Sequence, residues 1–435
     1  MTAVRAPEEV DHRIRREPPP WIAVSAAVFV CCWGGNQFSP LLLMYEERAH
    51  YSSVIANGLL GIYVIGLIPA LLIAGAMSDG RGRRPLMLAG VVATIVGSAL
   101  LAFGPVGLGF LAGGRLLSGV GVGVAMAVGT SWLTELSRAP YDPRSDDGAG
   151  ARRSAVAFGA GSACGALVAG LFAQWGPHPE TLPFVVHIVL GLPVLAAVAR
   201  VPETRTRAVG ARDAAATRGS LRSRLDLPGI RHRRFIRIVM IASPWIFGAA
   251  GIGYAYLPTQ LSATGSHGLL FATAASIIAL ATSSAVQPLA RWIHSDTSAR
   301  GLMVAIGALA LGLALVTVSI AIQSIPLGLI ANVAVGFGIG IGQVSGLLEV
   351  QRIARHGELA ALTGVFYSLA YLGFLFPVII AALAAHVAVV GILWTLVGLA
   401  VITGALVAVS SRRHLPVRVV EPGEDAPVRT SHSRL

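Results

Sequence analysis

The chain has 435 residues, of which 54% are hydrophobic and only 12% charged, whereas about a quarter of the residues in a typical soluble domain are charged. Mean hydropathy is +0.72 and the formal net charge is +12. So little polar surface excludes an ordinary soluble enzyme. The chain also lacks lysine, which excludes a phosphate-binding P-loop and a Schiff-base lysine.

Apolar runs of about 20 residues recur along the chain, and each is long enough to cross roughly 30 Å of hydrocarbon. Because lipid offers no hydrogen-bond partners to the backbone, these runs predict helices, and the fold class is an all-α membrane protein. Twelve transmembrane helices are expected, at 21–44, 53–77, 85–104, 107–134, 154–175, 182–200, 236–257, 269–291, 301–322, 326–350, 360–384 and 388–410.

The arginines are unevenly distributed between the predicted loops. Arg48 is the one arginine in a predicted outer loop, and Arg115 lies inside a helix; the others lie in the tails or in loops after even-numbered helices. The positive-inside rule therefore predicts a cell-membrane protein with both termini in the cytoplasm. The expected parts are a tail at 1–20, a bundle at 21–200, a linker at 201–235, a bundle at 236–410 and a tail at 411–435.

The two halves of the chain match at an offset of 217 residues. The glycine run 119–123 aligns with 336–340, and Ser78-Asp79 aligns with Ser295-Asp296. Parallel repeats of this kind are one of the known transporter architectures. The repeat therefore predicts two pseudo-symmetric six-helix bundles.

The loop after the second helix carries a glycine and arginine motif. It reads Gly75-Ala-Met-Ser-Asp79-Gly-Arg-Gly82-Arg83-Arg84. An aspartate at a helix end can accept N–H bonds from a neighbouring helix N-terminus, and Arg83 can pair with a carboxylate from another helix. The loop resembles the signature motif of the major facilitator superfamily, although Gly80 stands where a basic residue is usual. The resemblance implies the major facilitator fold and a conformational latch made of Gly75, Asp79, Gly82, Arg83, Arg84 and Glu135.

The fourth helix carries the one clearly intramembrane charge, Arg115, followed by Gly119, Gly121 and Gly123. The glycines allow close helix packing, and a charge in the membrane by default marks a functional site. The stretch is similar to a second motif of the superfamily. On the fifth helix Gly161-x-x-x-Gly165-Ala166 is close to the motif of its antiporters, with Ala166 in place of proline.

Polar and aromatic side chains are concentrated on the first, seventh, tenth and eleventh helices. At about 1.5 Å per residue, Asn36 and Arg115 lie at similar depth, so one substrate could contact both. The resemblance implies that the third, sixth, ninth and twelfth helices face lipid. The expected substrate cavity is lined by Trp33, Asn36, Gln37, Arg115, Trp245, Tyr254, Gln343, Tyr367 and Tyr371.

No acidic residue lies in the middle of a predicted helix, so no coupling residue is evident. Candidates near helix ends are Glu46, Glu47, Glu135, Glu349 and His187. The expected partners are the lipid bilayer, a small-molecule substrate and protons as a candidate coupling ion, with no nucleic acid, cofactor or metal ion. A monomer is expected.

These observations favour a secondary transporter that works by alternating access. Aromatic and amide side chains suit flat apolar solutes, and Arg115 suits anionic or carbonyl-bearing ones, so efflux of an amphipathic compound is preferred. Proton-coupled uptake of a sugar or organic acid and a non-transporting membrane sensor remain as alternatives. Since no catalytic motif lies in the helices, we expect no enzyme activity.

Overall fold

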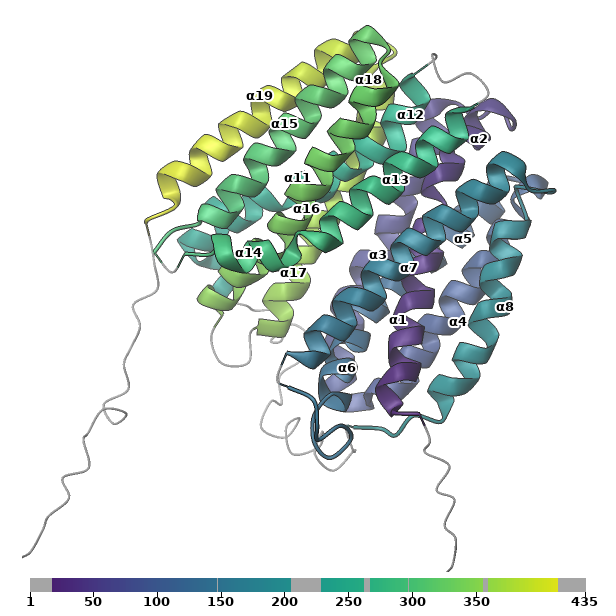
Figure 1. Ribbon diagram of the computed structural model, residues 1–435, viewed down its shortest axis with the longest axis vertical. Helices are drawn as coiled ribbons and strands as arrows, with labels where there is room; N and C mark the ends of the chain where they lie inside the picture. Colours follow the sequence, from purple (N-terminus) through teal and green to yellow (C-terminus); the bar gives the residue numbers. More distant parts are fainter. Residues whose placement is uncertain are drawn as a thin grey trace, which may run out of the picture.

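The computed structural model describes residues 18–146, 148–204, 228–261, 267–295, 297–354 and 359–413, and these residues form helices joined by short turns, without a strand (Figure 1). Twelve of these helices are long and apolar enough to cross a membrane. The prediction of an all-α membrane protein with twelve transmembrane helices is therefore confirmed.

Six spans form the first half of the molecule, and two of them are interrupted. The first span joins α1 to α2 through a 3₁₀ turn, and the fourth joins α5 to α6 through a π-helical turn, η3. The elements are α1 (Pro20–Asn36), η1 (Ser39–Leu41), α2 (Leu42–Glu47), α3 (Ser53–Arg81), α4 (Arg83–Ala102), η2 (Gly104–Val106), α5 (Leu108–Val124), η3 (Ala125–Gly129), α6 (Thr130–Leu136), α7 (Ala149–Trp175) and α8 (Leu182–Ala199).

The second half also has six spans, and its first contains two π-helical turns, η5 and η6. The elements are η4 (Pro228–Arg231), η5 (Phe235–Met240), α11 (Ile241–Ala250), η6 (Gly251–Tyr256), α12 (Leu257–Gln260), α13 (Gly268–Ala285), α14 (Gln287–Ile293), α15 (Arg300–Ile322), α16 (Ile325–Ile353), α17 (Leu359–Leu372), η8 (Gly373–Leu375), α18 (Phe376–Leu383) and α19 (Val389–Ser410).

Several predicted helix boundaries differ from the structure by a few residues, and two of the differences have a clear local cause. The fifth span begins at Ala149, five residues before the apolar run, because Asp146 accepts a hydrogen bond from the Gly148 N–H at 2.8 Å and from Arg152. The eighth span was expected to be continuous, but it breaks at Val286 and resumes as α14. Pro288 explains the break, since proline lacks the N–H of a helix interior but is tolerated in a first turn.

The two halves lie side by side and meet along four spans, two from each half. α3 packs against α17 and α18, and α7 packs against α13 (Figure 1). We call the end of the molecule that holds Pro20 and Ser410 the termini end. At the opposite end, α2 contacts α12 and α13. One large buried apolar cluster includes residues of both halves, so the core is continuous across the boundary.

The repeated glycines pack in equivalent ways in the two halves. A Cβ at Gly119 would lie 2.1 Å from the Tyr63 carbonyl oxygen on α3, and one at Gly336 would lie 2.4 Å from that of Ala279 on α13. Only glycine permits such close backbone approach. The glycines therefore allow α5 to pack closely on α3 and α16 to pack closely on α13. Because Arg115 lies on α5, this packing also positions Arg115.

Candidate functional site

Arg115 is almost completely buried, with 1% of its surface exposed, where α5 meets α1 and α3. Its Nε donates to the Leu59 carbonyl oxygen at 3.2 Å, and its Nη1 donates to that of Gly35 at 3.1 Å. The guanidinium carbon lies 4.7 Å from the centre of the Phe38 ring and 4.5 Å from that of Tyr63. Backbone dipoles and ring faces thus hold the cation in place.

The charge of Arg115 is not neutralised by a carboxylate. Among the residues that the structure describes, no acidic side chain forms an ion pair with it. A guanidinium offers five N–H donors, and two of them have backbone partners here. Since a buried cation without a counter-ion is costly, this position favours an anion or a carbonyl oxygen as its ligand.

Four aromatic rings connect the two halves beside Arg115. We call Tyr63, Phe247, Tyr371 and Phe374 the interhalf aromatic cluster. Tyr63 of α3 lies 6.3 Å from Tyr371 and 6.4 Å from Phe374, measured between ring centres. Phe247 stacks on Tyr371 at 4.3 Å and on Phe374 at 5.5 Å. These flat surfaces can stack on a planar apolar group.

Two of the other predicted cavity residues lie near this cluster. Tyr371 belongs to it, and Tyr254 is buried on η6 close to Arg115. Tyr367 is one turn before Tyr371 and packs on Phe366, with ring centres 5.0 Å apart. Gln343 is half-buried on α16, and its side chain makes no hydrogen bond with another described residue.

The side chains of the remaining predicted cavity residues form contacts within their own half of the molecule. Trp245 donates its indole N–H to Thr403 on α19 at 3.2 Å. Asn36 donates to Ser162 on α7 at 3.0 Å and to the Cys32 carbonyl oxygen. Although α1 reaches Arg115 through the Gly35 carbonyl, the Asn36 side chain is therefore directed to a different neighbour.

A buried polar chain occupies the first half between α1, α4 and α8. Gln37 donates to the Ser98 hydroxyl at 2.8 Å, Ser98 lies 2.8 Å from Nδ1 of His187, and Nε2 of His187 lies 2.9 Å from the Val30 carbonyl oxygen. The Val30 oxygen can only accept, so Nε2 of His187 carries a proton. The centre of the Trp33 ring lies 6.4 Å from the centre of the His187 ring.

Four site residues were missed at the level of sequence: Phe38, Tyr63, Phe247 and Phe374. The available signal was the glycine pattern, because Gly119 and Gly123 require α3 to approach α5 closely and so bring Tyr63 beside Arg115. Phe247 lies seven residues before Tyr254, the spacing of one helix face. Nothing in the sequence distinguishes Phe374 from lipid-facing phenylalanines.

The latch residues form a charged network at the termini end of the first half. The Arg83 guanidinium pairs with Glu135 of α6 at 3.0 Å and also donates to the Ser78 hydroxyl. Thr204 donates to the second oxygen of Glu135. A cation, a carboxylate and two hydroxyls thereby tie the α3–α4 turn to α6 and to the segment after α8.

Glu203, which sequence reasoning did not place in the latch, caps the N-terminus of α4. Its two carboxylate oxygens accept the backbone N–H groups of Arg83 and Arg84, each at 2.9 Å. Gly82 precedes them with φ +96°, and a Cβ there would lie 2.5 Å from Glu203 Oε2. The glycine thus permits both the turn and the close approach of the carboxylate.

The described contacts of the latch stay within the first half of the molecule. Gly75 faces η3, where a Cβ added at Gly75 would lie 3.7 Å from the Cβ of Ala127, and the side chain of Asp79 lies outside the described residues. The resemblance implied contacts that form in one packing of the halves and break in the other. In this structure the ion pair of Arg83 is local, and its role as a latch remains a prediction.

The second half has its own charged network at the same end. Arg234 is fully buried and pairs with Glu349 through two bonds, of 2.7 and 3.1 Å. Arg352 adds a third contact to Glu349 at 3.1 Å. Glu349 was considered as a coupling residue at the sequence level, but both of its oxygens here are engaged by arginines.

Comparisons with known proteins agree with this architecture. Residues 22–377 match the model of the Major Facilitator Superfamily. The chain is 35% identical over 74 residues to the multidrug resistance protein MdtL of Citrobacter koseri, covering 17% of this chain and 19% of that protein. It is 25% identical over 158 residues to the bacillibactin exporter of Bacillus subtilis, covering 35% and 39%. The matches thus span well under half the length of these relatives.

Solved structures show the same fold at low sequence identity. A POT family transporter in complex with 5-aminolevulinic acid has a TM-score of 0.72 at 12% identity, covering 92% of this chain and 98% of that one. A D-xylose-proton symporter has a TM-score of 0.67 at 17% identity, covering 91% and 97%. Together with the match over residues 22–377 and the twelve spans, these findings show that the chain belongs to the Major Facilitator Superfamily and is a multi-pass membrane transporter, not an enzyme.

Proposed function

We propose that this transporter exports a small amphipathic organic compound across the cell membrane by alternating access of its two halves. The two partial relatives are a multidrug resistance protein and an exporter by name. The proposed substrate class also fits the site. Aromatic surfaces and a single cation can accept varied flat molecules rather than one sugar.

The observation that carries the proposal is the unneutralised charge of Arg115 beside the interhalf aromatic cluster. The cluster takes Tyr63 from one half and Phe247, Tyr371 and Phe374 from the other, so rearrangement of the halves must separate or regroup these rings. A substrate with a planar apolar body and a carboxylate or carbonyl group would stack on the rings and satisfy Arg115. Tyr254, Tyr367 and Gln343 are further candidates for contact with the substrate.

We place the termini end in the cytoplasm because arginines are concentrated in the tails and in the loops at that end. The networks of Arg83 with Glu135 and of Arg234 with Glu349 then lie at the cytoplasmic surface. There they hold the helix ends of each half together, as is needed if each half moves as a rigid body during alternating access. Reporter fusions at Leu435 and within the 210–220 segment should be active only in cytoplasmic assays, and a periplasmic signal from either fusion would refute this orientation.

The test of export uses purified protein in liposomes that contain a panel of fluorescent planar compounds, either anionic or uncharged. Export predicts that an imposed proton gradient drives accumulation of an anionic aromatic compound on the side equivalent to the cell exterior. Accumulation of a sugar or aliphatic acid on the cytoplasmic side would instead support uptake. Size-exclusion chromatography with light scattering tests the expected monomer.

A further inference from the structure

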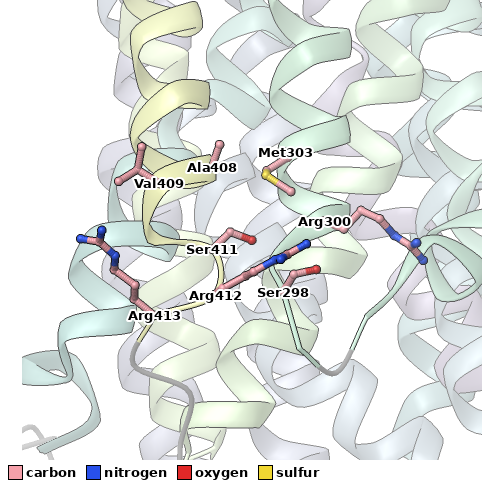
Figure 2. A pocket seen from close by; sticks show the side chains of 8 residues that line it. All are labelled: Ser298, Arg300, Met303, Ala408, Val409, Ser411, Arg412 and Arg413. Atoms are coloured by element: carbon pink, nitrogen blue, oxygen red, sulfur yellow. The ribbon is translucent and has the colours of Figure 1, made fainter.

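A basic pocket lies at the termini end of the second half, away from Arg115 and the aromatic cluster. It is enclosed by the start of α15 and the end of α19 and has a volume of about 410 Å³. Three arginines and three apolar residues line most of it: Arg300, Arg412, Arg413, Met303, Ala408 and Val409 (Figure 2).

The pocket is positively charged, and none of the wall residues that the structure describes is acidic. Figure 2 shows Arg412 directed from the end of α19 toward the start of α15, with Arg300 and Arg413 diverging to either side. Arg300 is held by the carbonyl oxygens of Ile293 and His294, at 2.7 and 3.3 Å. Arg412 makes no ion pair or side-chain hydrogen bond with the described part of the chain.

The walls of the pocket are held in position by buried bonds. Arg234 donates through Nη1 to the carbonyl oxygens of Ser411 and Arg413, at 2.9 and 3.0 Å, while its ion pair with Glu349 fixes the guanidinium. The Ser411 hydroxyl accepts the Ala299 N–H at 2.8 Å. The end of α19 and the start of α15 are therefore tied together, so the pocket is preformed rather than a gap between loose ends.

The pocket opens onto a surface suited to hydrocarbon. Val409 and Val401 on α19 are 61% and 58% exposed, and Leu311 on α15 is 57% exposed, as expected for helices that face lipid. An occupant must therefore be anionic where it meets Arg412 and apolar where it meets Met303 and Val409. A soluble anion meets only the first condition.

We propose that this pocket binds the headgroup of an anionic phospholipid, with the phosphate at Arg412 and the acyl chains along α15 and α19. Basic pockets between transmembrane helices near the membrane surface suit such headgroups. Phosphatidylglycerol fits better than phosphatidylcholine, because the quaternary ammonium of choline would be placed close to the Arg412 guanidinium. The contact would fasten α19, the outermost helix of the second half, to the bilayer at its end.

The test is native mass spectrometry of the full-length protein, titrated with phosphatidylglycerol or with phosphatidylcholine. We expect tight binding of phosphatidylglycerol, about fivefold weaker binding in Arg412→Gln and a larger loss in Arg412→Gln/Arg413→Gln. Arg291→Gln is the matched control, because Arg291 is an exposed arginine on α14 at the same end and outside the pocket. It should bind phosphatidylglycerol like the wild type.

Four results would overturn the proposal. They are unchanged binding in the double variant, an equal loss in the Arg291 control, equal affinity for phosphatidylcholine, and displacement of the lipid by millimolar inorganic phosphate, which would indicate a site for a soluble anion. The acidic tail residues Glu421, Glu424 and Asp425 offer one more test. If their neutralisation to amides raised lipid binding, the tail rather than lipid would be the normal occupant, and the proposal would fail.

Discussion

Replacing Gly82 by alanine tests the account of the α3–α4 turn most directly. Gly82 has φ +96° and ψ 161°, a backbone region that essentially only glycine occupies. An added Cβ would lie 2.5 Å from Oε2 and 2.9 Å from Cδ of Glu203. Gly82→Ala must therefore strain the backbone and displace the carboxylate that caps α4.

Two contributions set the size of the effect. The backbone conformation costs about 1 to 3 kcal/mol for a residue with a side chain. Loss of the cap on the Arg83 and Arg84 N–H groups costs about 0.5 to 2 kcal/mol. The displaced carboxylate can regain water at this end of the molecule, so we expect Gly82→Ala to lower the free energy of unfolding by about 2 to 4 kcal/mol.

The assay combines thermal unfolding of the purified protein in detergent with hydrogen exchange of the first turn of α4. Gly80→Ala is the matched control, because a Cβ at Gly80 meets nothing within 4 Å and its backbone is helical. That control should be neutral or stabilising by up to about 1 kcal/mol. In a Glu203→Ala background, the cost of Gly82→Ala should shrink to its backbone part. Equal stability of the Gly82 and Gly80 variants would refute the reasoning.

Further predictions concern charged residues. If Arg115 holds an anionic substrate through its planar fork of donors, Arg115→Lys should weaken substrate binding almost as much as Arg115→Ala, by about tenfold or more, and full rescue by lysine would refute the bidentate contact. Glu349→Gln leaves Arg234 buried without a carboxylate and should cost about 3 to 5 kcal/mol in unfolding measurements; an unchanged unfolding midpoint would contradict the burial of the pair. Asp79→Asn should reduce transport in liposomes at unchanged protein yield, and Asp296→Asn should reduce it less, because the second loop lacks the glycines; transport by Asp79→Asn at the wild-type rate would remove that residue from the latch.

A pH effect is expected in the turn before α7. The hydrogen bond from Arg152, with a further bond from the Gly148 N–H, holds the pKa of Asp146 below its ordinary value of 3.8. A depressed pKa means that the ionised form stabilises the turn above that ordinary value, and that this stabilisation is lost as the pH falls through the lower folded pKa. The protection factors of residues 148–152, which are exchange rates corrected for the intrinsic pH dependence of amide exchange, should therefore fall below about pH 4 and change little between about pH 6 and 8. The Asp146→Asn variant should not show this loss of protection.

The fold was predictable because its signal is long and repeated. Each span carries enough apolar residues to be recognised alone, and the glycine pairs at Gly119 and Gly336 are read from the sequence as a repeat before any contact is known. The break at Val286 was not predicted, because a proline in a long apolar run is compatible with a kinked continuous helix as well as with two helices. The hydrogen bonds of Asp146, with which α7 begins before its apolar run, also leave no signal in a hydropathy profile.

The site was less predictable because the faces of the helices could not be assigned. Trp245 and Tyr254 are nine residues apart, so a helix of 3.6 residues per turn points them to nearly opposite faces, but the sequence does not say which of these faces meets the other half. In the structure Trp245 contacts α19, whereas Tyr254 lies near Arg115. Phe374 lies on a 3₁₀ turn, which changes the helix phase.

The matching glycine contacts of the two halves also bear on how such a chain can diverge after duplication. Gly119 and Gly123 rest on the carbonyls of Tyr63 and Leu67, and in the other half Gly340 rests on that of Ser283. At these glycines a single added methyl group would displace a whole helix. Selection should therefore remove almost every substitution at these positions. New substrates can therefore be acquired by drift of the polar and aromatic lining while the helix scaffold inherited by both copies stays the same.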